Sequence, residues 1–126
     1  MEHITSPSAQ PLGLPFSEAM RAGDFLFLSG AIGNRPGTPT LVEGWLAPQA
    51  RQAMENIGEV LEACGRSFGD IVKVTVMLAG MRRLAEFNTV YVEYFDPARL
   101  PARSAFSASG LALGGEVEVE CVAYWP

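Results

Sequence analysis

The pattern of hydrophobic and polar positions predicts a β-hairpin and then a loop. Residues 16–20 and the apolar run 25–30 are separated by a turn signal at residues 21–24, which is typical of two antiparallel strands. Because residues 25–30 are almost continuously apolar, we expect this strand to be covered on both faces. Glycine and proline are frequent between residues 33 and 44, which predicts a loop at the rim of a cleft.

Two later segments have the spacing of amphipathic helices, and a strand lies between them. In the first, residues 47–64, the apolar side is Ala47, Ala50, Ala53, Met54, Ile57, Val60, Leu61 and Cys64, and Gly65 supplies the end. In the second, which ends before Pro97, the apolar side is Met81, Leu84, Phe87, Val90, Tyr91, Tyr94 and Phe95. Residues 70–79 are rich in β-branched side chains and predict the strand.

The last third predicts two strands, 102–109 and 116–125, joined by a glycine-rich turn. The element order is therefore β-β-α-β-α-β-β, which indicates a single-domain α+β fold whose two helices cover one face of a sheet. Residues 1–14 contain repeated prolines and predict an irregular N-terminal arm, so we expect the folded domain to span residues 15–126.

The final strand has one apolar and one acidic side. Its odd-numbered residues from Val117 to Ala123 are apolar, whereas Glu116, Glu118 and Glu120 alternate with them. Because two helices cover only one face of the sheet, the other face needs a different cover. A second copy of the chain is the simplest one, and we expect a homo-oligomer.

Composition and charge exclude several classes of protein. The chain has 126 residues, 48% of them hydrophobic and 18% charged, which is typical of one globular domain. Its net charge of −5 argues against a general nucleic-acid binder, because such proteins place many cations against phosphates. No apolar run is long enough to cross a bilayer, and no signal peptide is evident at the N-terminus, so we expect a cytoplasmic protein.

Few residue types suited to metal or cofactor chemistry are present. The one histidine, His3, lies near the N-terminus, and Cys64 and Cys121 have no metal-ligand or redox spacing. We expect the two cysteines to be buried thiols in a reducing compartment. No glycine-rich phosphate loop follows a strand. The sequence predicts no metal site and no organic cofactor.

The segment 101–109 is the strongest candidate for a binding site. On strand periodicity Arg103, Ala105 and Ser107 share one face, so a guanidinium stands beside small side chains that leave room for a ligand. A guanidinium matches a carboxylate with two parallel hydrogen bonds. The alternative is that Arg103 pairs with Glu118 or Glu120 on a neighbouring strand.

The acidic face of the last strand has two interpretations. Three carboxylates at alternate positions are most often solvated. If they line an interface cleft instead, crowding and partial burial raise the pKa of at least one of them, and that carboxyl can hold or transfer a proton.

The sequence resembles the RidA/YjgF family, also called the L-PSP endoribonuclease family. The resemblance covers residues 15–123 and depends on several motifs in the same order and at the same spacing. The motifs are Gly23-Asp24-x-Leu26-x-Leu28-Ser29-Gly30; Gln49-Ala50-Arg51-Gln52 with Asn56; Gly69-Asp70-Ile71-Val72-Lys73-Val74-Thr75-Val76; Phe87-Asn88-x-x-Tyr91-x-x-Tyr94-Phe95; Pro101-Ala102-Arg103-Ser104; and Val117-Glu118-Val119-Glu120.

The resemblance implies a chorismate-mutase-like α+β fold, a homotrimer with clefts between subunits, and hydrolysis of reactive 2-imino and enamine acids to 2-keto acids and ammonia without a cofactor. Arg103 would hold the substrate carboxylate, and Glu118 would position water or pass a proton. Ser29, Gly30 and Ala31 match the lining of the family's cleft.

The chain also departs from the family at Phe16, where many deaminases have tyrosine, and at Ala105, which is often cysteine. Both changes make the expected substrate pocket more apolar and predict lower activity or a bulkier substrate. Two alternatives stay open: a trimer that binds small 2-keto carboxylates without turnover, and the ribonuclease or translation-inhibitor activity of the older family name. The acidic composition argues against the second.

Overall fold

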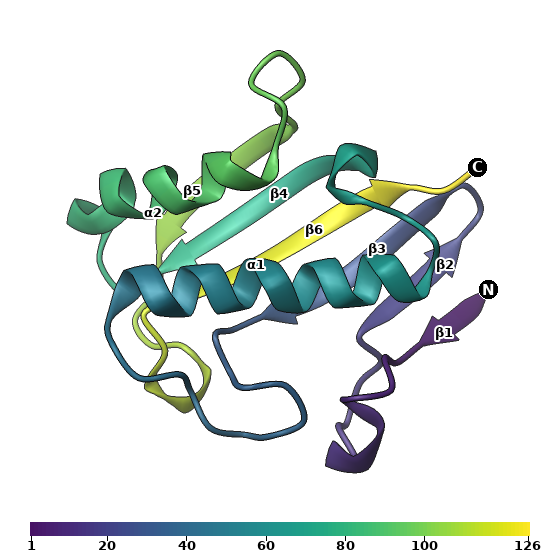
Figure 1. Cartoon of the computed structure of the whole chain (residues 1–126), viewed down its shortest axis with the longest axis horizontal. Helices are drawn as coiled ribbons and strands as arrows, with labels where there is room; N and C mark the ends of the chain where they lie inside the picture. Colours follow the sequence, from purple (N-terminus) through teal and green to yellow (C-terminus); the bar gives the residue numbers. More distant parts are fainter.

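A six-stranded sheet forms one layer of the molecule, and two helices lie across one of its faces (Figure 1). The computed structural model describes all 126 residues. The strands have the order β1-β2-β3-β6-β4-β5, and only the β4–β5 pair is parallel. The elements are β1 (Glu2–Ile4), β2 (Ala19–Ala22), β3 (Phe25–Ala31), α1 (Leu46–Ala63), β4 (Ile71–Leu78), α2 (Leu84–Tyr91), β5 (Ala102–Ser107) and β6 (Val117–Tyr124).

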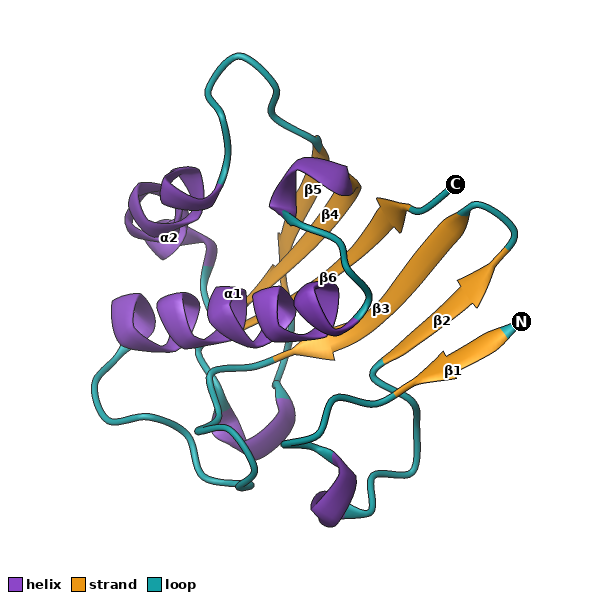
Figure 2. Cartoon of the chain, turned by 45° about the vertical axis from the view of Figure 1, so that its right-hand side comes forward, coloured by secondary structure: helices purple, strands orange, loops and turns teal.

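The predicted α+β class, and the order of elements after the arm, are confirmed. The prediction of an irregular arm over residues 1–14 is wrong at its start, because β1 pairs with β2 and extends the sheet by one strand (Figure 2). The prolines of this arm begin at Pro7, so nothing prevents the preceding residues from hydrogen bonding to a free sheet edge. The rest of the arm contains one short 3₁₀ turn, Gln10–Leu12.

Strand β2 begins three residues later than the predicted strand 16–20. The hairpin closes through the two residues Gly23 and Asp24, which pairs Ala22 with Phe25. Gly23 has a φ of +59°, a conformation that two-residue hairpin turns require and that glycine adopts without strain. The turn therefore sets the register of the hairpin.

The apolar sides predicted for the two helices form the core against the sheet. The fully buried residues of α1 include Ala50, Ala53, Met54, Ile57 and Leu61, and those of the sheet include Leu26, Val74, Val76, Val117 and Val119. The second helical segment is shorter than predicted, because 3₁₀ turns flank α2 at Met81–Arg83 and Val92–Tyr94. Its aromatic residues are nevertheless packed together, with Tyr91 and Phe95 4.8 Å apart between ring centroids.

Strands β5 and β6 are not neighbours, although a short turn between them was predicted. Strand β4 lies between them, parallel to β5 and antiparallel to β6. Helix α2 connects β4 to β5, and such a crossover joins strands that run in the same direction. Residues 108–116 then carry the chain past β4 to the start of β6. Residues on β5 and β6 are therefore separated by a whole strand.

The sheet face opposite the helices is rich in accessible aromatic side chains. Phe25, Phe27, Phe106 and Tyr124 are each between 41% and 49% exposed. Phe25 and Tyr124 are in contact, with ring centroids 5.7 Å apart. The outward side of β3 is therefore uncovered in a single chain.

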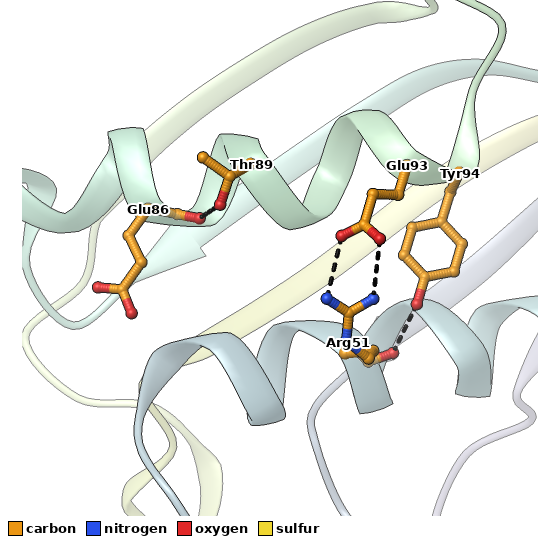
Figure 3. A network of polar contacts seen from close by, with 5 residues as sticks. All are labelled: Arg51, Glu86, Thr89, Glu93 and Tyr94. Atoms are coloured by element: carbon orange, nitrogen blue, oxygen red, sulfur yellow. Dashed lines mark hydrogen bonds and ion pairs between the residues drawn. The ribbon is translucent and has the colours of Figure 1, made fainter.

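An ion pair connects α1 with the 3₁₀ turn Val92–Tyr94 that follows α2 (Figure 3). The Arg51 guanidinium donates from Nη1 and Nη2 to the two carboxylate oxygens of Glu93, at 3.3 and 3.0 Å. The Tyr94 hydroxyl donates to the Arg51 carbonyl at 3.4 Å. These contacts hold α2 in place over the sheet.

None of the helices is both long and apolar enough to span a membrane.

Candidate functional site

Most of the predicted site residues line one cleft of about 710 Å³ at the end of β3. Phe16, Ser29, Gly30, Ala31 and Glu118 all contribute to its wall. The rest of the wall comes mainly from the N-terminal arm, the loop after β3, the outer side of α1 and the loop before β6: Ser8, Ala9, Leu12, Leu14, Asn34, Pro36, Gly37, Thr38, Pro39, Asn56, Glu59, Val60, Ala112 and Leu113 among others.

A break in the strand pairing shapes the floor of the cleft. The β3–β6 register shifts between Leu28 and Ala31, so Ser29 and Gly30 have no registered partner on β6. Ser29 is held from the other side, because its N–H donates to the Glu18 carbonyl at 2.8 Å and its hydroxyl donates to the Ser17 carbonyl at 2.7 Å. The segment that carries Phe16 is thereby tied beside the end of β3.

Gly30 makes room for the Glu118 carboxylate. A Cβ atom at position 30 would lie 2.0 Å from Glu118 Oε2 and 2.8 Å from its carboxyl carbon. Only a residue without a side chain lets the carboxylate rest against the backbone here. Gly30 and Glu118, which the sequence analysis named separately, therefore lie side by side in the structure.

The Glu118 carboxyl is in an environment that disfavours its charge. Partial burial is the main cause that raises its pKa above the usual range, and the like charge of Glu120 on the same strand raises it further. None of the four ion pairs in the chain involves Glu118. This carboxyl is suited to hold or transfer a proton.

Arg103 and Ala105 lie outside the cleft. In the parallel β4–β5 register they pair with Val74 and Val76, which are buried under the helices, so they point to the helical side of the sheet. Arg103 Nη1 donates to Asn88 Oδ1 on α2 at 2.7 Å, and its guanidinium carbon lies 4.8 Å from the centroid of the Tyr91 ring. The alternative that Arg103 pairs with Glu118 or Glu120 is wrong, because the carboxylates lie two strands away.

Arg103 and Glu118 lie on opposite faces of the sheet. Glu118 pairs with Met77, whose neighbours in β4, Val76 and Leu78, are the residues buried under the helices. In a single chain the predicted cation and acid therefore do not meet.

Asn88 and Tyr91 belong to the surroundings of Arg103 but were predicted only as family motif and core residues. Their i, i+3 spacing in α2 places both on the side of the helix that faces β5. The Tyr91 hydroxyl is buried without a hydrogen-bond partner, and burial raises the pKa of Tyr91 to about 12. Its ring supplies a neutral aromatic surface for the guanidinium.

The chain contains no cluster of three or more His, Cys, Asp and Glu residues that could hold a metal. Both cysteines are free thiols, Cys121 buried and Cys64 partly buried.

These features define an α+β protein with one large cleft. The Glu118 carboxylate lies on the floor of this cleft, where the pairing of β3 with β6 is interrupted. The family model described as Endoribonuclease L-PSP matches residues 7–125, and the chain belongs to this family. The resemblance to RidA/YjgF proteins that the motifs predicted is thereby confirmed.

Named relatives match over nearly the whole chain. A RutC family protein of Pyrococcus horikoshii is 43% identical, over 96% of this chain and 94% of the relative. The 2-iminobutanoate/2-iminopropanoate deaminase of Bos taurus is 39% identical, over 95% of this chain and 88% of that protein. The crystal structure of RidA from an Antarctic Psychrobacter bacterium has a TM-score of 0.90 and 35% identity, over 98% of this chain and 99% of that one.

Proposed function

We propose that the protein hydrolyses 2-imino acids to 2-keto acids and ammonia, at a site that Glu118 of one subunit and Arg103 of the next complete together in a homotrimer. The observation that carries the proposal is the placement of a raised-pKa carboxyl, Glu118, on the floor of a large cleft. The names of deaminase relatives at 37–39% identity support the reaction class.

The charge of the cleft supports a site shared between subunits. Four glutamates line the cleft, Glu18, Glu59, Glu118 and Glu120, and no lysine or arginine does. A substrate carboxylate needs a cation close by, because burying it beside like charges costs free energy. Arg103 is on the wrong face to serve the cleft of its own chain, so a second copy must bring it.

The uncovered face of the sheet supports such an assembly. Accessible aromatic side chains gather on that face, which is the face that carries Glu118. Burying apolar surface of this kind against another copy stabilises an oligomer. A cyclic trimer then repeats one shared cleft at each interface.

The reaction follows from the groups brought together. Arg103 binds the carboxylate in a bidentate contact and is itself held by Asn88 and Tyr91, so that the adjacent C=N carbon is fixed. Water adds to this carbon while the electron pair of the C=N bond moves to nitrogen, which takes a proton from Glu118. The added water returns a proton to Glu118. Glu118 then protonates nitrogen again, the C–N bond of the resulting carbinolamine breaks and nitrogen leaves as ammonia. An electron pair of the hydroxyl oxygen forms the C=O bond of the keto acid as the hydroxyl proton passes to Glu118, which restores its protonated form.

Subunit complementation tests the shared site. Arg103→Ala and Glu118→Ala should each lose activity on imines that an amino-acid oxidase generates, while remaining folded trimers. In a cyclic trimer, a random equal mixture of the two co-expressed variants contains on average about a quarter of intact sites, so about a quarter of wild-type activity should return. Hybrids as inactive as their parents would disprove the shared site.

The same preparations separate the alternative functions. Binding of a 2-keto acid in calorimetry without imine hydrolysis would favour a binding trimer. Cleavage of RNA that follows the protein through size exclusion and is lost in Arg103→Ala would favour a ribonuclease. The four glutamates of the cleft, against one arginine brought by the partner subunit, argue against the second, since proteins that bind RNA place many cations against its phosphates.

A further inference from the structure

We infer that the cleft selects 2-imino acids with a large uncharged side chain, branched aliphatic or aromatic, over those with a methyl group or an acidic side chain. This inference rests on the proposed function and concerns the same cleft. It depends on apolar residues that line the cleft together with Glu118 and are not buried in the hydrophobic core.

Three of these apolar side chains remain accessible to solvent. Leu14 is 36% exposed, Phe16 is 50% exposed and Leu113 is 58% exposed, and all three line the cleft. They come from the N-terminal arm, the segment before β2 and the loop before β6. Apolar side chains from separate segments that converge on one concave surface indicate a place where an apolar group of a ligand binds.

The backbone at Leu113 is held in an unusual conformation. Leu113 is the only residue other than glycine with a positive φ, at φ 58° and ψ 20°. Leucine rarely adopts this left-handed conformation, and the surrounding loop must therefore impose it. Backbone strain of this kind is concentrated at functional sites, and here it places a leucine in the cleft wall.

In a single chain the cleft is larger than the smallest 2-imino acids need. Its volume of about 710 Å³, before a partner contributes Arg103, lies in the range of pockets that hold drug-sized ligands. A substrate with a methyl side chain leaves the apolar wall in contact with water. A longer apolar side chain removes that surface from water, and the free energy gained increases with the area buried.

The charges of the cleft exclude an acidic side chain. Besides Glu118 and Glu120, the wall of the cleft contains Glu18 and Glu59. Both accept hydrogen bonds from the N-terminal arm: Glu18 from the Ser6 N–H at 2.7 Å, and Glu59 from the Ser8 hydroxyl. A second carboxylate on the substrate would meet these like charges without a cation to offset them.

The test compares imines made in situ from alanine, leucine, phenylalanine and glutamate. For the wild type, kcat/KM for the leucine or phenylalanine imine should exceed that for the alanine imine at least about tenfold. The glutamate imine should be the poorest. Leu113→Asn, which keeps a residue that tolerates positive φ, should lower the leucine-to-alanine ratio of kcat/KM about fivefold.

Val92→Asn is the matched control, because Val92 is 50% exposed and does not line the cleft. It should leave every ratio unchanged. Calorimetry with the corresponding 2-keto acids supplies a readout without turnover, and Leu113→Asn should weaken the binding of the branched product more than the binding of pyruvate.

The outcomes distinguish the two levels of the proposal. Hydrolysis of the alanine imine without a preference for leucine, efficient hydrolysis of the glutamate imine, or a ratio unaffected by Leu113→Asn overturns the inference alone. No acceleration of any imine overturns the proposed function and this inference with it.

Discussion

At the residue scale, two neighbouring positions decide the chemistry available in the cleft. Gly30 lacks the Cβ that would meet the Glu118 carboxylate, and Glu118 rests in the space that this leaves. The partial burial that results, together with Glu120, raises the pKa of Glu118. An acid whose pKa is raised in the folded state lowers stability wherever it is ionised.

Glu118→Gln should therefore raise the melting temperature at pH 7 to 8. The destabilisation by the ionised carboxylate is full above the raised folded pKa, decreases as the pH falls through it, and is absent below the unfolded pKa of about 4.3. Thermal melts of both proteins from pH 8 to 4 should accordingly converge at the acidic end. A difference that grows towards low pH would contradict the assigned environment. The same variant should lose imine hydrolysis.

At the scale of secondary-structure elements, the position of α2 determines where Arg103 points. Asn88 and Tyr91 on α2 hold the guanidinium. Arg51 on α1 fixes the 3₁₀ turn that follows α2 through its ion pair with Glu93 (Figure 3). The hydrogen bond and the charge of Arg51 lower the pKa of Glu93. The two helices therefore act as a support for a side chain on β5.

Glu93→Gln should cause a small drop in melting temperature at pH 7. Because the pKa of Glu93 is lowered, the ion pair stabilises the fold above the unfolded pKa of about 4.3 and loses this effect as the pH falls through the folded value. The difference between variant and wild type should disappear near pH 3 and shrink in 1 M salt, because both partners are exposed. Glu86→Gln, at another exposed pair, Arg83–Glu86, controls for the loss of a surface charge. A drop that persists at pH 3 would mean that the contact acts by packing alone.

At the scale of the whole molecule, one chain is incomplete in two respects. Its sheet has a face of accessible aromatic residues, and its cleft lacks the cation that a carboxylate substrate needs. A second copy that packs against the open face would cover the aromatic residues, and it would supply the missing cation if it contributes Arg103. Assembly and activity should therefore be lost together.

Phe27→Asp should dissociate the oligomer and abolish imine hydrolysis. Phe27 is 49% exposed on the open face, so a charge there opposes burial in an interface while leaving the monomer core intact. Light scattering after size exclusion should report a monomer with an unchanged far-UV circular dichroism spectrum. Val92→Asp, on the helical side, should remain assembled and active. A monomeric Phe27→Asp protein with full activity would disprove the shared site.

Much of the fold could be predicted because local patterns specify local elements. The spacing of apolar residues in α1 and the β-branched run of β4 are determined by short segments, and both elements appear within one residue of the predicted bounds. β1 was missed, since a three-residue strand is stabilised only by the edge it pairs with. The boundary of β2 was misplaced because the hairpin turn, rather than the hydrophobic run, sets it.

The sequence by itself indicated the candidate site residues: the isolated Arg103 among small side chains, the alternating glutamates of the last strand, and Gly30 after an apolar run. Only the tertiary structure decided how they are arranged, because strand order depends on contacts between segments far apart in the chain. By inserting β4 between β5 and β6, and by turning Arg103 and Glu118 to opposite faces, the fold separates two groups that the sequence alone would place side by side.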